Sequence, residues 1–304
     1  MSDKAFVFPG QGSQKVGMLK DVADQFPEIL TTFEEASTVV GYDMWKLIQE
    51  GEQDALNMTE VTQPVLLTSS VAYWRLWQSQ GLATPVVLAG HSLGEFSALV
   101  CAESLAFADA VNLVKLRGQF MQTAVPVGVG AMAAIIGLDD DVIDKICAET
   151  STESGVVQAV NYNSPGQVVI AGHAAAVDLA IEKLKEAGAK RAMPLPVSAP
   201  FHTDLMQPAG VNLKEAMSDL IFHTPKIPVV HNVHAKTESD PNEIKALMVK
   251  QIYSPVKWTD CVRTISQMGV KEMIECGPGK VLSGLAKRID KSLSCQSIDA
   301  ALLK

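Results

Sequence analysis

Apolar residues near the start of the chain form one short continuous run and then recur at helical spacing. The run at residues 5–8 stops at Pro9, which predicts a buried first strand at residues 4–8. Recurrence every three to four residues then predicts a set of helices, at residues 26–40, 44–50, 63–80 and 108–124. A second short apolar run, at residues 86–89, predicts a strand between the last two of these helices.

Residues 126–198 follow a different order of elements. Strand patterns and helical patterns succeed one another here as βαββαβ, with strands at 130–138, 156–164, 166–172 and 189–197 and helices at 140–150 and 174–188. This order is typical of the ferredoxin-like unit. We therefore predict a ferredoxin-like subdomain at residues 126–198, inserted into a larger unit.

The last third of the chain alternates between strand and helix. Its pattern predicts strands at 228–233 and 273–278 and helices at 243–251, 254–269 and 279–289. Such alternation favours a parallel sheet with helices on both faces. Because 304 residues exceed what one hydrophobic core supports, we predict an α/β fold in two parts. An α/β-hydrolase-like core of residues 1–125 and 199–304 would carry the ferredoxin-like insertion.

Gly90, Ser92 and Gly94 form a G-x-S-x-G motif between a predicted strand and a helix that starts near Glu95. This is the setting of a nucleophile elbow, in which a tight turn holds the serine in a strained backbone conformation. The two glycines would let strand and helix approach closely. The N–H of Leu93 would then face an oxyanion at the start of the helix. A tight strand–helix turn with an incidental serine is the alternative interpretation.

Two further features of the sequence could bind an anion. Arg117 lies on the apolar face of its predicted helix, since its neighbours three and four positions away are Leu113, Val114, Phe120 and Met121. A buried guanidinium needs an anionic partner, which is either an internal carboxylate or the carboxylate of a substrate. The loop at residues 10–14 contains two glycines and two amide side chains, but it has no nucleotide-binding motif.

A nucleophilic serine needs a base, and the chain has six histidines. His202 follows a predicted strand at a stiff Pro-Phe-His corner, where active-site loops of α/β proteins belong. The side chain of His91 would point elsewhere from the tight turn, and the other four have no feature that favours them. His202 is therefore the candidate base, and an ordinary surface or helix-start histidine is the alternative.

Composition narrows the class of protein. Hydrophobic residues make up 47% of the chain and charged residues 19%, which indicates a globular protein with a substantial core. The net charge of −9 argues against nucleic-acid binding. We expect neither a signal peptide nor a membrane span, because no apolar run approaches ~18 residues. Five scattered cysteines without C-x-x-C spacing predict a reduced cytoplasmic protein that holds no structural metal.

The motifs taken together resemble one known family. They are FVFPGQGSQ, GHSLGE, VKLRGQFM, GAMAAI, NYNSPGQVVIAG, SAPFH, QIYSPVKW and GPGKVLSGL, in family order from Phe6 to about Leu285. This set resembles the malonyl-CoA:acyl-carrier-protein transacylases of bacterial type II fatty-acid synthesis. The resemblance implies transfer of a malonyl group from malonyl-CoA to the phosphopantetheine thiol of acyl carrier protein. It also implies a ping-pong reaction through a malonyl-serine, with no cofactor.

The resemblance further assigns roles to residues of this chain. Ser92 would be the nucleophile, His202 the general base, and Arg117 the ligand of the malonyl carboxylate. The other matching positions are Gln11 and Leu93 for the oxyanion hole, the backbone carbonyl of Gln251 for orienting the histidine, and Gln63 and Asn161 for the pocket. Phe201 would narrow the pocket beside the base, although corner packing alone would also explain it.

Several alternatives remain at this level. An esterase or thioesterase would use the same serine and histidine with water as acceptor, and a carrier-binding subunit would use neither. A malonyl or methylmalonyl loader of a polyketide pathway would share the chemistry. We expect a monomer whose partners are malonyl-CoA and an acidic carrier protein, with neither nucleic acid nor membrane as partner. The carrier would dock on a local basic patch, for which the candidates are Lys190, Arg191, Lys287 and Arg288.

Overall fold

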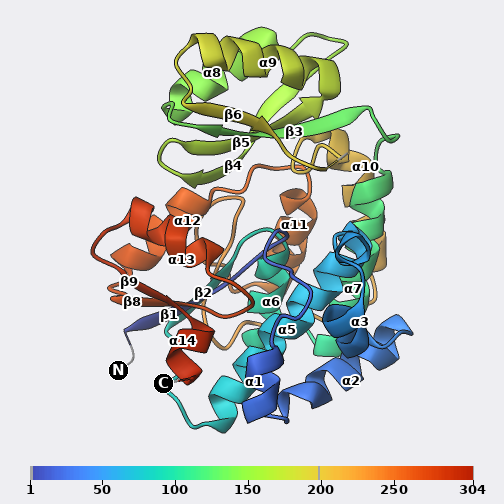
Figure 1. The fold of residues 1–304 in the computed structure, drawn as a ribbon, viewed down its shortest axis with the longest axis vertical. Helices are drawn as coiled ribbons and strands as arrows, with labels where there is room; N and C mark the ends of the chain where they lie inside the picture. Colours follow the sequence, from blue (N-terminus) through green and yellow to red (C-terminus); the bar gives the residue numbers. More distant parts are fainter. Residues whose placement is uncertain (1–2, 198, 304) are drawn as a thin grey trace.

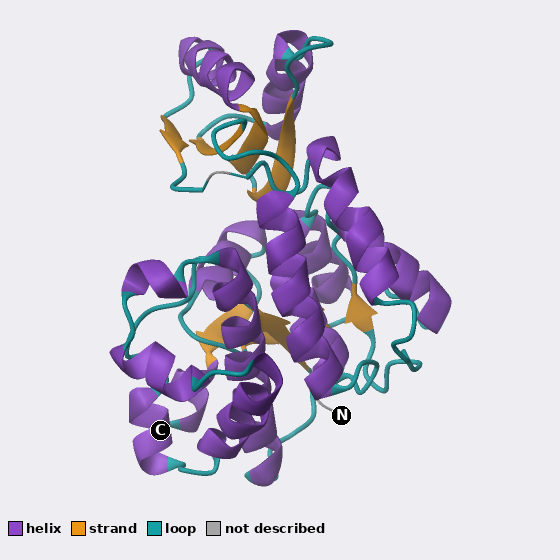
Figure 2. Ribbon diagram, turned by 90° about the vertical axis from the view of Figure 1, so that its right-hand side faces the viewer, coloured by secondary structure: helices purple, strands orange, loops and turns teal. Residues whose placement is uncertain are grey.

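Two sheets organise the chain, and the antiparallel one lies above the parallel one in Figure 1. The computed structural model describes residues 3–197 and 199–303. The larger, lower part is a parallel sheet between helical layers, and the smaller, upper part is an antiparallel sheet with two helices on its outer side (Figures 1 and 2). The predicted α/β class is confirmed.

The parallel sheet has five strands in the order β7-β2-β1-β8-β9. They are β1 (Lys4–Phe8), β2 (Val87–Gly90), β7 (Val229–Val230), β8 (Glu272–Glu275) and β9 (Ser294–Ser297). Every neighbouring pair in this sheet runs parallel. The chain connects these strands through helices, as parallel pairing requires.

The helices around this sheet come from both ends of the chain. Before the small sheet they are α1 (Lys20–Gln25), α2 (Ile29–Val40), α3 (Met44–Glu50), α4 (Gln53–Leu56), α5 (Thr59–Ser79), α6 (Leu93–Cys101) and α7 (Phe107–Thr123). After it they are the 3₁₀ turn η1 (Asp204–Met206), α10 (Gln207–Ala216), α11 (Pro241–Gln251), α12 (Trp258–Gln267), α13 (Val281–Ile289) and α14 (Ile298–Leu302).

Side chains of β1 enter two different cores. Phe6 and Phe8 belong to the core that contains buried residues of α2, α5 and α7. Ala5 and Val7 belong to a second core, which α12 and α13 cover. Successive side chains of a strand point to opposite faces, so a strand between two helical layers must be apolar at every position. This requirement explains the uninterrupted apolar run at residues 5–8, the fully buried part of β1.

The antiparallel sheet has the strand order β4-β5-β3-β6, which is the order of a ferredoxin-like unit. Its strands are β3 (Gly130–Ile136), β4 (Val157–Ser164), β5 (Gln167–His173) and β6 (Arg191–Pro194). Helices α8 (Asp140–Thr150) and α9 (Ala174–Glu186) pack on one face and share a separate core with the strands. The other face is turned toward the parallel sheet (Figure 1).

The segment between α11 and α12 ties the small sheet to the large part. Val256 pairs with β4 as an isolated parallel bridge: its N–H donates to Val160 O at 2.8 Å, and its carbonyl accepts from Tyr162 N at 3.0 Å. Thr259 Oγ1 also donates to Tyr162 O at 3.0 Å. These contacts fix one wall of the space between the two sheets.

Several elements differ from the sequence prediction. The helix predicted at 26–40 begins later, at Ile29, after Pro27, and the short helix α1 before it was not predicted. Helix α5 begins four residues earlier than predicted and carries Pro64 in its interior. The strand predicted at 228–233 is shorter, because β7 covers only Val229–Val230. The chain turns after it, and His231 N–H donates to Lys236 O at 2.9 Å. Strand β9 and α14 were not predicted.

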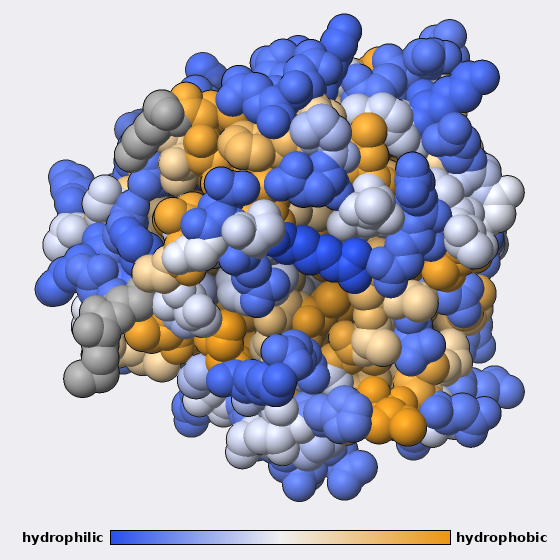
Figure 3. Space-filling model, turned by 90° about the horizontal axis from the view of Figure 1, so that it is seen from below, coloured by the Kyte–Doolittle hydropathy of each residue, from blue (hydrophilic) through white to orange (hydrophobic). Residues whose placement is uncertain are grey.

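The surface seen from below carries mostly hydrophilic side chains, with hydrophobic residues between them (Figure 3). Within residues 3–197 and 199–303, no helix combines the length and the apolar character that a membrane crossing requires.

Close packing at the turn between β2 and α6 depends on two glycines. A Cβ on Gly90 would lie 1.9 Å from the carbonyl carbon of Gly94, and a Cβ on Gly94 would lie 2.0 Å from Phe8 O. Both neighbours are backbone atoms, which cannot move aside without displacing the strands. The close approach inferred from the sequence is therefore present in the fold.

A Gly94→Ala substitution is expected to prevent stable folding, because its methyl group would overlap the backbone of β1. The control is Gly284→Ala in α13, where a Cβ meets nothing within 4 Å. The control is expected to gain up to about 1 kcal/mol, since alanine favours helix more than glycine. Thermal unfolding followed by circular dichroism compares the two. An unchanged melting temperature for Gly94→Ala would contradict the packing described here.

Candidate active site

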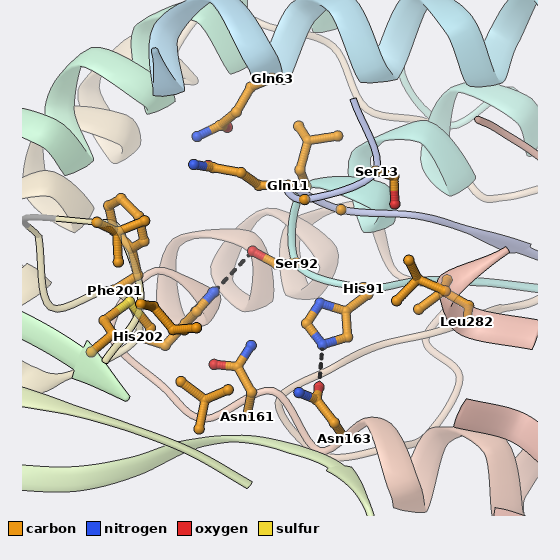
Figure 4. A pocket seen from close by; sticks show the side chains of 18 of the residues that line it. Gln11, Ser13, Gln63, His91, Ser92, Asn161, Asn163, Phe201, His202 and Leu282 are labelled. Atoms are coloured by element: carbon orange, nitrogen blue, oxygen red, sulfur yellow. Dashed lines mark hydrogen bonds between the residues drawn. The ribbon is translucent and has the colours of Figure 1, made fainter. Parts of the chain in front are cut away.

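The hydroxyl of Ser92 meets the imidazole of His202 at the carboxyl end of the parallel sheet. Ser92 lies in the turn between β2 and α6 with φ 50° and ψ −106°, which is a strained conformation for a residue other than glycine. Its Oγ is 2.8 Å from His202 Nε2 (Figure 4). The turn thus presents the side chain to a histidine 110 positions later in the chain.

His202 has its second ring nitrogen fixed by the backbone. Its Nδ1–H donates to the carbonyl of Gln251 at 2.8 Å, which leaves Nε2 to accept the proton of Ser92 Oγ. The ring is only 4% exposed, and burial, reinforced by the charge of Arg117, lowers the pKa of His202 to about 3. The imidazole is therefore neutral and available as a base over the physiological range.

Arg117 reaches the same place from α7, although it is only 1% exposed. Its Nη1 donates to Gln63 Oε1 at 2.7 Å, and its Nη2 donates to Gln251 Oε1 at 2.9 Å and to Ser92 Oγ at 3.1 Å. The guanidinium also lies 5.4 Å from the centre of the Phe96 ring. A buried cation is therefore held against the hydroxyl of Ser92 by neutral groups.

The alternative of an internal ion pair for Arg117 is not supported. None of the ion pairs formed within residues 3–197 and 199–303 includes this guanidinium, and its Nε–H is buried without a hydrogen-bond partner. Burial lowers the pKa of Arg117 to about 10, and the charge of Glu95 opposes that shift. Arg117 remains a cation near neutral pH and has an N–H to offer a further acceptor.

A cavity of about 270 Å³ opens at these residues, between the parallel sheet and the inner face of the small sheet. Ser92, His202 and Arg117 line it from the core, while Met132 and Val169 line it from the small sheet. The wall thus combines a few polar groups with apolar surface, as is usual for small-molecule sites.

The other residues singled out in the sequence also line this cavity: Gln11, Gln63, Leu93, Asn161 and Phe201. Figure 4 shows Gln11 and Gln63 on one side of Ser92 and Asn161 on the opposite side. The amide of Gln11 is exposed, and its Nε2 lies 3.5 Å from Thr59 Oγ1. The oxygen of Asn161 is buried and has no hydrogen-bond partner. Ser198, which begins the corner that holds His202, lies outside the described residues.

The side chain of His91 points away from that of Ser92, the next residue in the chain. Its Nε2 is 2.8 Å from Asn163 Oδ1 on β4, and burial lowers the pKa of the ring. Figure 4 shows this pair separated from the pair of Ser92 and His202. The sequence analysis expected this side chain to point away from Ser92, as it does here.

Sequence reasoning missed a buried polar group behind Ser92. Glu95 is fully buried and contacts His231 Nδ1 at 2.6 Å, and it also accepts from Asn232 N at 3.1 Å and Gln251 Nε2 at 2.8 Å. Asn232 Oδ1 in turn accepts the N–H of Ser92 at 2.8 Å. The sequence feature that could have revealed it is a glutamate directly after the G-x-S-x-G motif, on a helix whose other early residues are apolar or small.

Comparison with known proteins places the chain in a family. Residues 5–298 match the family described as acyl transferase domain. A malonyl CoA-acyl carrier protein transacylase of Salmonella typhimurium is 55% identical over 98% of this chain and 96% of its own length. A protein of the same name from Bacillus subtilis is 45% identical over 96% and 92%, respectively.

Solved structures agree with these relatives. The structure of an acyl carrier protein S-malonyltransferase from Vibrio cholerae superimposes with a TM-score of 0.95 at 56% identity, covering 97% of this chain and 96% of that one. A malonyl-transacylase in complex with a type II polyketide acyl-carrier protein has a TM-score of 0.95 at 52% identity, with coverage of 97% and 96%. The chain therefore belongs to the acyl transferase family, and within it to the malonyl CoA-acyl carrier protein transacylases.

Proposed function

We propose that this protein transfers a malonyl group from malonyl-CoA to the phosphopantetheine thiol of acyl carrier protein through a malonyl-Ser92 intermediate. The observation that carries the proposal is the buried guanidinium of Arg117, 3.1 Å from Ser92 Oγ and without an ion-pair partner among the described residues. An acyl group bound to Ser92 that ends in a carboxylate would supply the missing anion.

The first half of the reaction uses the serine and the histidine. His202 Nε2 takes the proton of Ser92 Oγ as that oxygen attacks the thioester carbonyl of malonyl-CoA. The N–H groups of Leu93 and Gln11 are the proposed donors to the oxyanion that forms. When the carbon–sulfur bond breaks, the imidazolium returns the proton to the sulfur of CoA, and malonyl-Ser92 remains.

The second half reverses these steps with another thiol. CoA leaves, and the phosphopantetheine arm of the carrier enters the cavity. His202 Nε2 takes the proton of the thiol as its sulfur attacks the malonyl ester, and then protonates Ser92 Oγ as the ester bond breaks. The carbonyl of Gln251 holds the imidazolium through Nδ1 with a neutral acceptor, so the pair is a Ser-His dyad rather than a triad with an acid.

Three further residues of the cavity receive roles in this proposal. Gln63 accepts from Arg117 Nη1 and fixes the direction of the guanidinium. Asn161 offers an unpaired buried oxygen to the pocket, and Phe201 limits the space beside His202. We also propose that residues 126–198 are an inserted subdomain that serves as the roof of the cavity.

The alternatives are less well supported. An esterase has no need of a buried cation beside its nucleophile, and a carrier-binding subunit has no need of a hydrogen-bonded serine and histidine. Loading a polyketide carrier would use the same chemistry, and one structural neighbour is the malonyl-transacylase of such a carrier. A cytoplasmic location is proposed because all five cysteines are buried free thiols.

Replacing Arg117 by alanine tests the proposed malonyl site. The variant is expected to transfer malonyl groups to the carrier at least about a hundredfold more slowly, because the carboxylate would lose its buried partner. Transfer of an uncharged acetyl group is expected to fall far less. The control is Lys115→Ala, which removes a cation two residues away whose Nζ donates to Val40 O at 3.2 Å. Equal losses for malonyl and acetyl transfer would contradict the assignment.

The low pKa of His202 predicts an unusual pH profile. A base with a pKa of about 3 stays neutral on mild acidification, so kcat/KM for malonyl-Ser92 formation should be nearly constant between about pH 8 and about pH 5.5. An ordinary histidine would be about 90% protonated at the lower value, and the rate would fall about tenfold. Rapid-quench measurement of the acyl-enzyme distinguishes the two cases.

The proposed docking patch for the carrier consists of exposed cations on α13 and on the small sheet. Lys287 and Arg288 lie on α13, which lines the cavity, and Arg288 Nη1 donates to Gln167 Oε1 at 2.7 Å. Gln167 and Arg191 both flank Ile136 in the small sheet. The patch therefore spans both parts of the molecule.

Reversing one charge of this patch is expected to affect only the second half-reaction. Lys287→Glu should raise the KM for the carrier by about threefold or more at low salt, and leave the formation of malonyl-Ser92 unchanged. The control is Lys46→Glu, on α3, away from the cavity. Steady-state kinetics with an unchanged carrier KM for Lys287→Glu would remove this docking site.

A further inference from the structure

Glu95 is a fully buried carboxylate that touches neither Ser92 Oγ nor His202. It lies in the first turn of α6, and both of its oxygens are occupied. Oε1 contacts His231 Nδ1 at 2.6 Å, while Oε2 accepts from the side chain of Gln251 at 2.8 Å and from the N–H of Asn232 at 3.1 Å. An ionised carboxylate only accepts hydrogen bonds, so every group that faces it must present a donor.

The carboxylate therefore determines which end of the Gln251 amide faces it. Gln251 Nε2 donates to Glu95 Oε2 and to Ser92 O, the latter at 2.9 Å. The amide oxygen is consequently turned to the opposite side, where it accepts from Arg117 Nη2 at 2.9 Å. Were the amide reversed, its NH₂ group would face a guanidinium that can only donate.

Charge favours the same arrangement. Arg117 is buried without an ion pair among the described residues, and Glu95 is the carboxylate that opposes the effect of burial on its pKa. One amide therefore lies between a buried anion and a buried cation, with its dipole aligned to both. The cost of burying the guanidinium is reduced without placing a carboxylate where the substrate must bind.

We propose that Glu95 is a positioning residue, which sets the preference for acyl groups that end in a carboxylate by orienting the Gln251 amide toward Arg117. The inference rests on the proposed function, because it concerns the same Arg117 site. It adds a residue that contacts no part of the substrate and acts through Gln251.

The test is Glu95→Gln. A neutral amide at this position can both donate and accept, so it no longer forces the NH₂ group of Gln251 to face it. The kcat/KM for malonyl-Ser92 formation is expected to fall about tenfold or more, the effect of weakening a hydrogen bond to a charged group. Formation of acetyl-Ser92 from acetyl-CoA is expected to fall by less than about threefold. Intact-protein mass spectrometry over a time course measures both rates.

The matched control is Glu275→Gln. Glu275 is also fully buried, and it accepts from the N–H groups of Leu282 and Ser283 at 3.0 and 2.8 Å. It contacts neither Gln251 nor Arg117. Losing this carboxylate is expected to lower the melting temperature without changing the ratio of malonyl to acetyl loading. A structural role of a buried carboxylate is thereby separated from positioning.

A second variant keeps the proposal testable if Glu95→Gln does not fold. Gln251→Met retains the backbone carbonyl that orients His202 and removes the amide between Glu95 and Arg117, so the same loss of malonyl preference is expected. An unchanged ratio of malonyl to acetyl loading in either folded variant would overturn the proposal. If the wild-type protein forms no malonyl-Ser92, the proposed function itself fails. Measuring the wild-type protein first therefore separates that failure from failure of the role proposed for Glu95.

Discussion

The site depends on the close contact between the backbone of β2 and the first turn of α6. Gly90 and Gly94 leave no room for a Cβ, so strand and helix meet closely, and Ser92 in the turn between them has a strained backbone with positive φ. This strain is held by hydrogen bonds on both sides: Asn232 accepts from Ser92 N–H and donates to Gly90 O at 2.7 Å. The turn places the hydroxyl in the wall of the cavity, where His202 and Arg117 both contact it.

Charge inside the site is arranged around one neutral residue. The backbone of Gln251 accepts from His202, and its side chain connects Glu95 with Arg117. Burial itself keeps the imidazole of His202 neutral, because it lowers the pKa of the ring. The guanidinium of Arg117 stays charged although it is buried, since Gln63, Gln251 and Ser92 accept its hydrogen bonds. Because no acid among the described residues pairs with Arg117, its free N–H stays available for the substrate carboxylate that we propose.

Much of this could be predicted from sequence because the signals are local. The elbow, the apolar face around Arg117 and the βαββαβ order of residues 126–198 each follow from neighbouring residues. The contacts behind the elbow could not be predicted, because Glu95 meets Asn232 from 137 positions away and His231 has no motif around it. Strand β9 (Ser294–Ser297) is short and polar, and it pairs with β8 at the edge of the sheet.

The central claim is that Ser92 carries the malonyl group. Intact-protein mass spectrometry after brief incubation with malonyl-CoA, in parallel with acetyl-CoA, tests it directly. The account predicts a malonyl adduct that maps to Ser92, is absent from Ser92→Ala and is discharged by carrier protein, with far less adduct from acetyl-CoA. Release of CoA without an adduct would instead indicate hydrolysis. The absence of both the adduct and CoA release would contradict an acyltransferase function for this chain.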